Sequence, residues 1–152
     1  MTKAKKIGEI TVNGRQVSMF TPPHDQPDFM WVDIEELARA FLPRAEARRM
    51  AAMARQVGGN KRTHATATNG DKIVTIVCHA EAQGFLGFLD VKAGRVPRNS
   101  EDMGPSSDTY SWAAAKFESE HGKLNSQEAI IHAFHNQGGP FTAGASYRGD
   151  PQ

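Results

Sequence analysis

The sequence predicts an α+β fold, in which a small antiparallel sheet of two hairpins and one short strand packs against about three helices. Two Asn-Gly pairs, Asn13-Gly14 and Asn69-Gly70, predict the hairpins because residues of strand character flank both. Asn-Gly readily adopts the positive φ angles of a tight hairpin turn. Apolar residues at helical spacing predict the helices. A short helical tail is expected at the C-terminus.

The composition is typical of one modest domain. The 152 residues are 39% hydrophobic and 23% charged, and their formal net charge is only +1, so any basic surface has to be local. The single cysteine, Cys78, allows no internal disulfide and fits a reducing compartment. No stretch has the length of a signal-peptide core or a membrane span. We therefore expect a cytoplasmic protein without a membrane partner.

The first hairpin is predicted around Asn13-Gly14, with Val12 paired to Arg15 and Ile10 paired to Val17. This register places four apolar side chains on one face: Ile10, Val12, Val17 and Met19. Polar side chains occupy the other face: Glu9, Thr11, Gln16 and Ser18. Pattern and turn therefore predict the same hairpin.

A short strand over residues 29–32 is predicted to lead into a helix that begins after Asp33. Asp33 is expected to cap this helix, with Glu36 three positions on as in a capping box. The apolar positions follow helical spacing: Ile34, Leu37, Ala38, Phe41 and Leu42. Pro43 is expected to end this helix and to open the next one.

The next helix, about residues 44–57, is predicted to carry a row of arginines and to end at Gly58-Gly59. Helical spacing places Arg44, Arg48 and Arg55 on one narrow face. It places a small apolar group on the opposite side: Ala47, Met50, Ala54 and Val57. One acid, Glu46, accompanies seven basic residues in this segment: Arg39, Arg44, Arg48, Arg49, Arg55, Lys61 and Arg62.

The second hairpin is predicted around Asn69-Gly70, with Thr66 opposite Ile73 and the β-branched residues 73–77 as an interior strand. A helix with Ala82, Phe85, Leu86 and Leu89 on one face is expected after it.

The composition changes after Val96, and we predict a binding domain over residues 1–96. Residues 97–109 are rich in Pro, Gly and Ser and are predicted to form a linker. Residues 110–152 are predicted to be a helical, partly flexible tail. A capping box at Asn125 and Glu128 opens its short helix.

Catalytic and metal chemistry have little support in the sequence. His132 and His135 are three positions apart and suit a shared metal, but no fixed third ligand accompanies them. Cys78 beside His64 or His79 is the only pattern that suits a nucleophile, and a lone cysteine after such a strand is usually a buried apolar residue. We therefore expect no enzyme, no cofactor and no metal.

Two stretches resemble known regulators. IEELARAF (residues 34–41) followed by the basic segment Arg48-Arg49-Met50 is similar to the start of bacterial helix-turn-helix regulators, although Leu42-Pro43 replaces the usual glycine-containing turn. Over about residues 7–96 the chain resembles the N-terminal domain of phage antirepressors and BRO-family proteins. The match is carried by these residues: Trp31, Val32, Asp33, Glu81, Gly84, Phe85 and Leu86. The resemblance implies a small α+β fold and a role in phage gene control.

These observations lead to the hypothesis of a phage or mobile-element regulator that binds the DNA backbone. Arg44, Arg48 and Arg55 are expected to meet phosphates, and the other basic residues of the segment to extend that surface. One alternative is an inhibitor, such as an antirepressor or anti-defence protein, that binds an acidic regulatory protein. Two more hypotheses stay open: the arginines merely solvate their helix, or the chain is an accessory protein without a nucleic-acid role. A homodimer is also compatible with the sequence.

Overall fold

The computed structural model describes residues 3–58, 63–97 and 104–135, and these form an α+β fold, as predicted. One antiparallel sheet has the strand order β1-β2-β3-β5-β4. Its strands are β1 (Lys6–Val12), β2 (Arg15–Phe20), β3 (Trp31–Asp33), β4 (His64–Asn69) and β5 (Lys72–Val77). The helices are α1 (Ile34–Arg39), α2 (Arg44–Gly58), α3 (His79–Lys92), α4 (Pro105–His121) and α5 (Gln127–His135).

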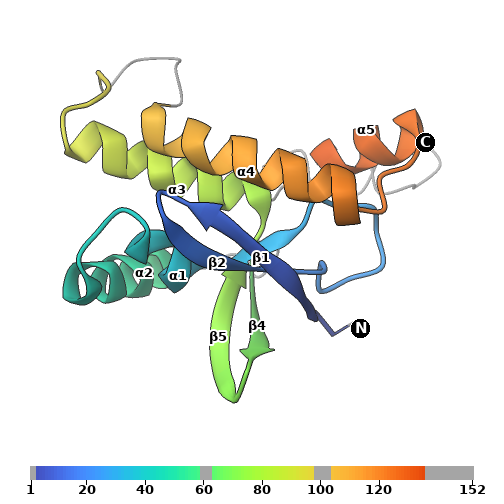
Figure 1. Cartoon of the computed structure of the whole chain (residues 1–152), viewed down its shortest axis with the longest axis horizontal. Helices are drawn as coiled ribbons and strands as arrows, with labels where there is room; N and C mark the ends of the chain where they lie inside the picture. The colour runs from blue at the N-terminus through green and yellow to red at the C-terminus, as the bar shows by residue number, and fades with distance from the viewer. Residues whose placement is uncertain (1–2, 59–62, 98–103, 136–152) are drawn as a thin grey trace.

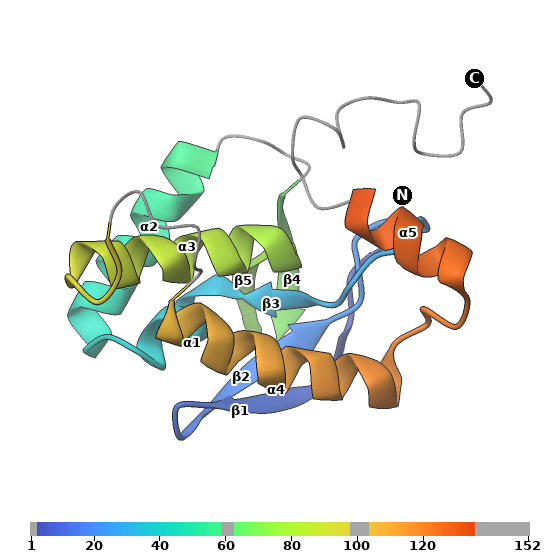
Figure 2. The ribbon, with the colours of Figure 1, turned by 90° about the horizontal axis from the view of Figure 1, so that it is seen from above.

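The helices lie on one side of the sheet and at its ends. α3 and α4 run side by side along that side, and the β4–β5 hairpin projects away from them (Figure 1). α2 and α5 lie towards opposite ends of the molecule (Figure 2). None of the helices in the described residues is long and apolar enough to cross a membrane.

The first hairpin has the predicted register. Val12 pairs with Arg15, Ile10 pairs with Val17, and the turn residues Asn13 and Gly14 have φ angles of 51° and 81°. The four apolar side chains assigned to one face are buried. Of the residues on the polar face, only Ser18 is buried.

The second hairpin has a different register from the predicted one. Thr66 pairs with Thr75 instead of Ile73, because Asn69 pairs with Lys72 as a strand residue and the turn is made by Gly70 and Asp71. Tertiary contacts explain this shift: the amide nitrogen of Asn69 lies 3.0 Å from the hydroxyl of Ser18 and 3.2 Å from a carboxylate oxygen of Asp33. β5 lies between β3 and β4, as predicted for an interior strand.

The segment around α1 begins as predicted and ends earlier. The Asp33 carboxylate accepts the backbone N–H groups of Glu35 and Glu36, both at 3.1 Å, and so caps α1. Glu36 does not close the predicted capping box, because its carboxylate accepts the backbone N–H of Ser18 at 2.7 Å. α1 ends at Arg39, three residues short of Leu42, and α2 begins directly after Pro43.

The predicted linker is wrong over its last five residues, because α4 begins at Pro105. Pro105 occupies the first turn, where its missing N–H costs nothing. The Asp90 carboxylate on α3 accepts the backbone N–H of Ser106 at 2.9 Å and its hydroxyl at 2.6 Å. Asp90 therefore caps α4 from another helix, in place of Gly104, which has no side chain for this role.

α4 belongs to the domain and is no separate tail. Its buried residues Tyr110, Ala114 and Phe117 join the same core as β1, β2, α1 and α3. The ring of Phe117 packs so closely on Gly8 that a Cβ there would lie 2.8 Å from it. The domain therefore extends past the predicted boundary at residue 96. α5 begins one residue later than predicted, with the Ser126 hydroxyl accepting the Ala129 N–H at 3.0 Å.

Candidate functional site

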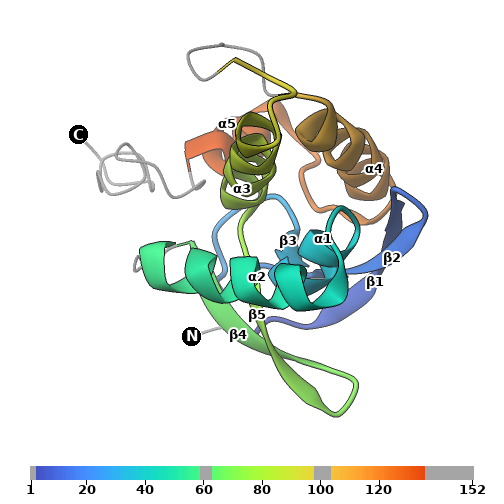
Figure 3. The same cartoon turned by 90° about the vertical axis from the view of Figure 1, so that its left-hand side faces the viewer.

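The arginine row of α2 is exposed at one end of the molecule. Arg44, Arg48 and Arg55 are all exposed, and Arg44 and Arg55 are roughly 16 Å apart along the helix axis. Figure 3 views this end and shows α2 at the surface, next to α3. Within the described residues, none of these three guanidinium groups forms an ion pair with an acid. The row is therefore free to meet an anionic partner.

The row lies along the border of the buried side of α2, whereas the sequence placed it opposite that side. Ala47 and Met50 are buried, as predicted, but Ala51 is also completely buried. Ala51 is three residues after Arg48 and four before Arg55, so it lies next to both on the helix surface. The packed side of α2 is therefore wider than the predicted apolar group, and the side chain of Val57 lies outside the described residues.

The other predicted basic residues differ in their settings. Arg49 is 71% exposed and lies 4.0 Å from Glu46. Arg39 on α1 is half-buried, and its Nε is inaccessible and has no hydrogen-bond partner among the described residues. Lys61 and Arg62 lie outside the described residues. The structure thus brings Arg44, Arg48, Arg49 and Arg55 together on one helix and leaves Arg39 on another.

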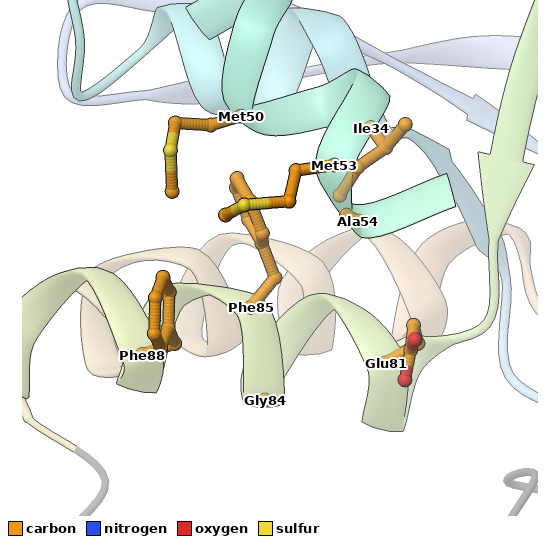
Figure 4. Close-up of a pocket in the computed structure, with 8 residues that line it drawn as sticks. All are labelled: Ile34, Met50, Met53, Ala54, Glu81, Gly84, Phe85 and Phe88. Atoms are coloured by element: carbon orange, nitrogen blue, oxygen red, sulfur yellow. The ribbon is translucent and has the colours of Figure 1, made fainter. Parts of the chain in front are cut away.

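An apolar groove of about 270 Å³ runs between α2 and α3 beside this basic helix. Figure 4 shows Met50 and Met53 of α2 reaching towards Phe85 and Phe88 of α3. Gly84 adds no side chain, and a Cβ there would point into open space. The complete lining is Ile34, Met50, Met53, Ala54, Glu81, Gly84, Phe85 and Phe88.

The ends of this groove carry opposite charges. The ammonium nitrogen of Lys92 lies 4.0 Å from the sulfur of Met50, and Glu81 at the other end lies 3.8 Å from Nε2 of His64. Methionine side chains adapt easily to different apolar partners. The groove was not predicted from the sequence. The signal that could have found it is the spacing of Met50 and Met53 and of Phe85 and Phe88, which are three residues apart on their helices.

Cys78 and His79, two of the residues considered for nucleophilic chemistry, both have pKa values shifted by burial. Cys78 is completely buried, and burial raises the pKa of its thiol to about 12, so it stays protonated at neutral pH. Burial lowers the pKa of His79 to about 4, and its Nδ1 lies 3.1 Å from the hydroxyl of Tyr110. The described residues contain no cluster of three or more His, Cys, Asp or Glu residues suited to a metal, and the side chain of His135 is not among those described.

Comparison of the chain with protein-family models, curated proteins and solved structures found no match. The resemblance to phage antirepressors and BRO-family proteins therefore stays a prediction. Function has to be inferred from two features of the α2 end, which are the arginine row and the α2–α3 groove.

Proposed function

We propose that this protein is a regulator, of phage or mobile-element type, that binds DNA through the exposed arginines of α2. The observation that carries the proposal is the row of Arg44, Arg48 and Arg55, exposed and without acidic partners among the described residues. Guanidinium groups bind phosphate oxygens through paired N–H donors, and each contact releases condensed counterions from the duplex. Arg49 lies on the same helix and extends this surface.

The salt dependence of binding tests the proposal most directly. Each phosphate contact contributes about 0.9 to the slope of log affinity against log salt. We expect the wild type to bind a labelled duplex with a slope that reflects three or four contacts. The variant Arg44→Ala/Arg48→Ala/Arg55→Ala should bind weakly, with a slope smaller by roughly three.

A matched control separates a local site from overall charge. The variant Arg15→Ala/Lys72→Ala/Lys116→Ala removes the same charge from exposed positions on β2, β5 and α4. It should bind duplex DNA with a slope close to that of the wild type. Equal losses in the two triple variants, or no binding by the wild type at low salt, would contradict the proposal.

The α2–α3 groove favours a second candidate function, an inhibitor that binds an acidic amphipathic helix of a regulatory protein. Apolar residues of such a helix would contact Met53 and Phe88, while its acidic residues would lie near Arg49 and Lys92. A designed amphipathic peptide with acidic flanks provides the probe. In this case Met53→Ala/Phe88→Ala should abolish peptide binding, whereas DNA binding by the same variant should be unchanged. Equal binding of the peptide by the wild type and by Met53→Ala/Phe88→Ala would eliminate this candidate.

A further inference from the structure

A second, larger cavity lies at the opposite end of the molecule, below α5. Its volume is about 620 Å³, within the range of small-molecule sites, and it is bounded by α3, α4, α5 and the segment before β3. Its apolar walls come from Met19, Phe29, Met30, Leu124, Ile130 and Phe134. This cavity is separate from the α2–α3 groove and shares no lining residue with it.

α5 does not fill this cavity. Ala133 is the only described residue of α5 that is fully buried, whereas Ile130, Ile131 and Phe134 are 40%, 47% and 60% exposed. Phe134 still contacts Phe29, with the ring centroids 5.1 Å apart and the ring planes at 77°. The helix therefore covers the cavity through a few apolar contacts and leaves space inside it.

Aromatic rings line one side of the cavity. The rings of Phe29 and Phe134 are in contact, and that of Phe29 lies 5.4 Å from the ring of His79. His79 is neutral at neutral pH, because burial lowers its pKa to about 4. The faces of such rings attract cations, and recognition of ammonium groups by aromatic side chains uses this attraction.

A single charged group lines the same space. Glu118 of α4 is the only acid among the described lining residues, and these include no lysine or arginine. One of its carboxylate oxygens accepts the backbone N–H of Met30 at 2.9 Å, whereas the other is inaccessible and has no hydrogen-bond partner among the described residues. Burial raises the pKa of Glu118, and the nearby charge of Asp28 adds to this effect. A carboxylate in such a setting gains from a cationic or donating partner.

Two features keep the carboxylate of Glu118 where it is. The bond to Met30 links α4 to the segment before β3, and the side chain packs on Gly122, where any Cβ would collide with it. Between α3 and α4, the Gln83 amide donates to the Ser111 hydroxyl at 2.8 Å, and this bond holds the two helices together. The acid and the aromatic rings thus belong to one preformed site.

We propose that this cavity binds a small organic cation with an apolar body, such as an arylalkylamine. Its ammonium group meets the Glu118 oxygen that also accepts the Met30 N–H, because the other oxygen is inaccessible and packs on Gly122. The ammonium group also contacts the ring face of Phe29 or Phe134, and the apolar part of the ligand fills the space between α4 and α5. The proposal does not depend on the arginine row, so either site stands if the other fails.

The test compares three indole probes that share a ring system and differ in charge: tryptamine, tryptophol and indole-3-acetate. Calorimetry with the wild type should give saturable binding of tryptamine and at least about tenfold weaker binding of indole-3-acetate. Glu118→Gln should remove this preference, because it replaces the charge with an amide of similar shape. Glu120→Gln, an exposed acid on the same helix, should keep the preference.

A second variant keeps the test decisive if Glu118→Gln does not fold. Phe134 is largely exposed, so Phe134→Ala should leave the fold intact and weaken tryptamine and tryptophol alike. The proposal is wrong if the wild type does not bind tryptamine, if it binds the three probes equally, or if the preference survives Glu118→Gln.

Discussion

The two ends of the molecule, at α2 and at α5, differ in how their helices pack and in what they expose. α2 packs on the core through Ala47, Met50 and Ala51. Because two of these side chains are small, its backbone lies close to the core, and its arginines extend into solvent. α5 buries Ala133 and leaves larger apolar side chains exposed above a cavity. One end therefore presents positive charge on an exposed helix, and the other leaves an open cavity lined by a single acid.

α4 runs between these two ends, and an acid lies near each end of this helix: Asp90 of α3 near its N-terminus and Glu118 of α4 itself near its C-terminus. Near its N-terminus, Asp90 is completely buried, and burial alone would raise its pKa. The hydrogen bonds from Ser106 and the contact with Arg95 outweigh burial and lower the pKa overall. Near its C-terminus, burial raises the pKa of Glu118, and one backbone N–H only partly offsets this. Complete hydrogen bonding favours the ionised form of Asp90, whereas incomplete hydrogen bonding leaves the ionised form of Glu118 disfavoured.

The largest expected effect comes from removing α4, because the α2 end and the α5 end should both unfold without the core residues that this helix supplies. A fragment ending at residue 96 loses Tyr110 and Phe117 from the core, and losing a buried aromatic side chain costs about 3–5 kcal/mol each. Because domains are stable by only about 5–15 kcal/mol, this fragment should show no cooperative thermal transition by circular dichroism. A chain ending at residue 124, which lacks only α5 and the residues after it, should keep one. Cooperative melting of the shorter fragment would show that the α2 end folds without α4.

The next largest effect concerns the cap that Asp90 provides to α4. Asp90→Asn should lower the free energy of unfolding by about 2–3 kcal/mol at neutral pH, because it weakens charge-assisted bonds to Ser106 and Arg95. Since the fold lowers this pKa, the contribution is present above the unfolded value of about 3.9 and disappears as the pH falls through the folded value. Urea unfolding across this pH range measures it. Asp108→Asn, at an exposed position in the first turn of α4, should cost much less.

A smaller loss of stability is expected from Asn69→Ala, because the amide of Asn69 links β4 to β2 and to the start of α1. This amide lies within hydrogen-bond distance of Ser18, Asp33 and Glu36, and its removal should cost about 1–2 kcal/mol. Chemical unfolding monitored by fluorescence checks this value. Thr68→Ala, at the adjacent exposed position of β4, should change stability much less, and equal effects of the two variants would contradict the role given to the amide.

The smallest effect has the opposite sign and concerns the α5 end. Glu118→Gln should slightly stabilise the unliganded protein at neutral pH, because the fold raises the pKa of Glu118 and so disfavours its ionised form. This gain in stability over the wild type should be complete above the raised pKa of Glu118, and it should vanish as the pH falls to the pKa of the unfolded state, about 4.3. Thermal melts of both proteins across this range measure the difference. A loss of stability at neutral pH would mean that the bond to Met30 outweighs the burial of the charge.

Local signals were enough to predict several elements from the sequence. The register at Asn13-Gly14 follows because the turn residues and the alternation of apolar side chains lie within one short segment. The cap at Asp33 and the start of α2 directly after Pro43 depend on the chemistry of single residues and their immediate neighbours. The same local reasoning identified the exposed arginines of α2, since helical spacing relates them directly.

Other features depend on partners that are distant in the sequence. The register of the second hairpin differs from the predicted one because the Asn69 amide bonds to Ser18, 51 positions away. α4 begins at Pro105, within the predicted linker, because Asp90 of α3 caps it. The cavity below α5 depends on the bond between Met30 and Glu118, which are 88 positions apart. Composition and periodicity describe neighbours along the chain, whereas a buried hydrogen bond or a cavity arises where distant segments pack together. The arginine row could therefore be predicted from the sequence, and the buried acid with its aromatic rings could be found only in the fold.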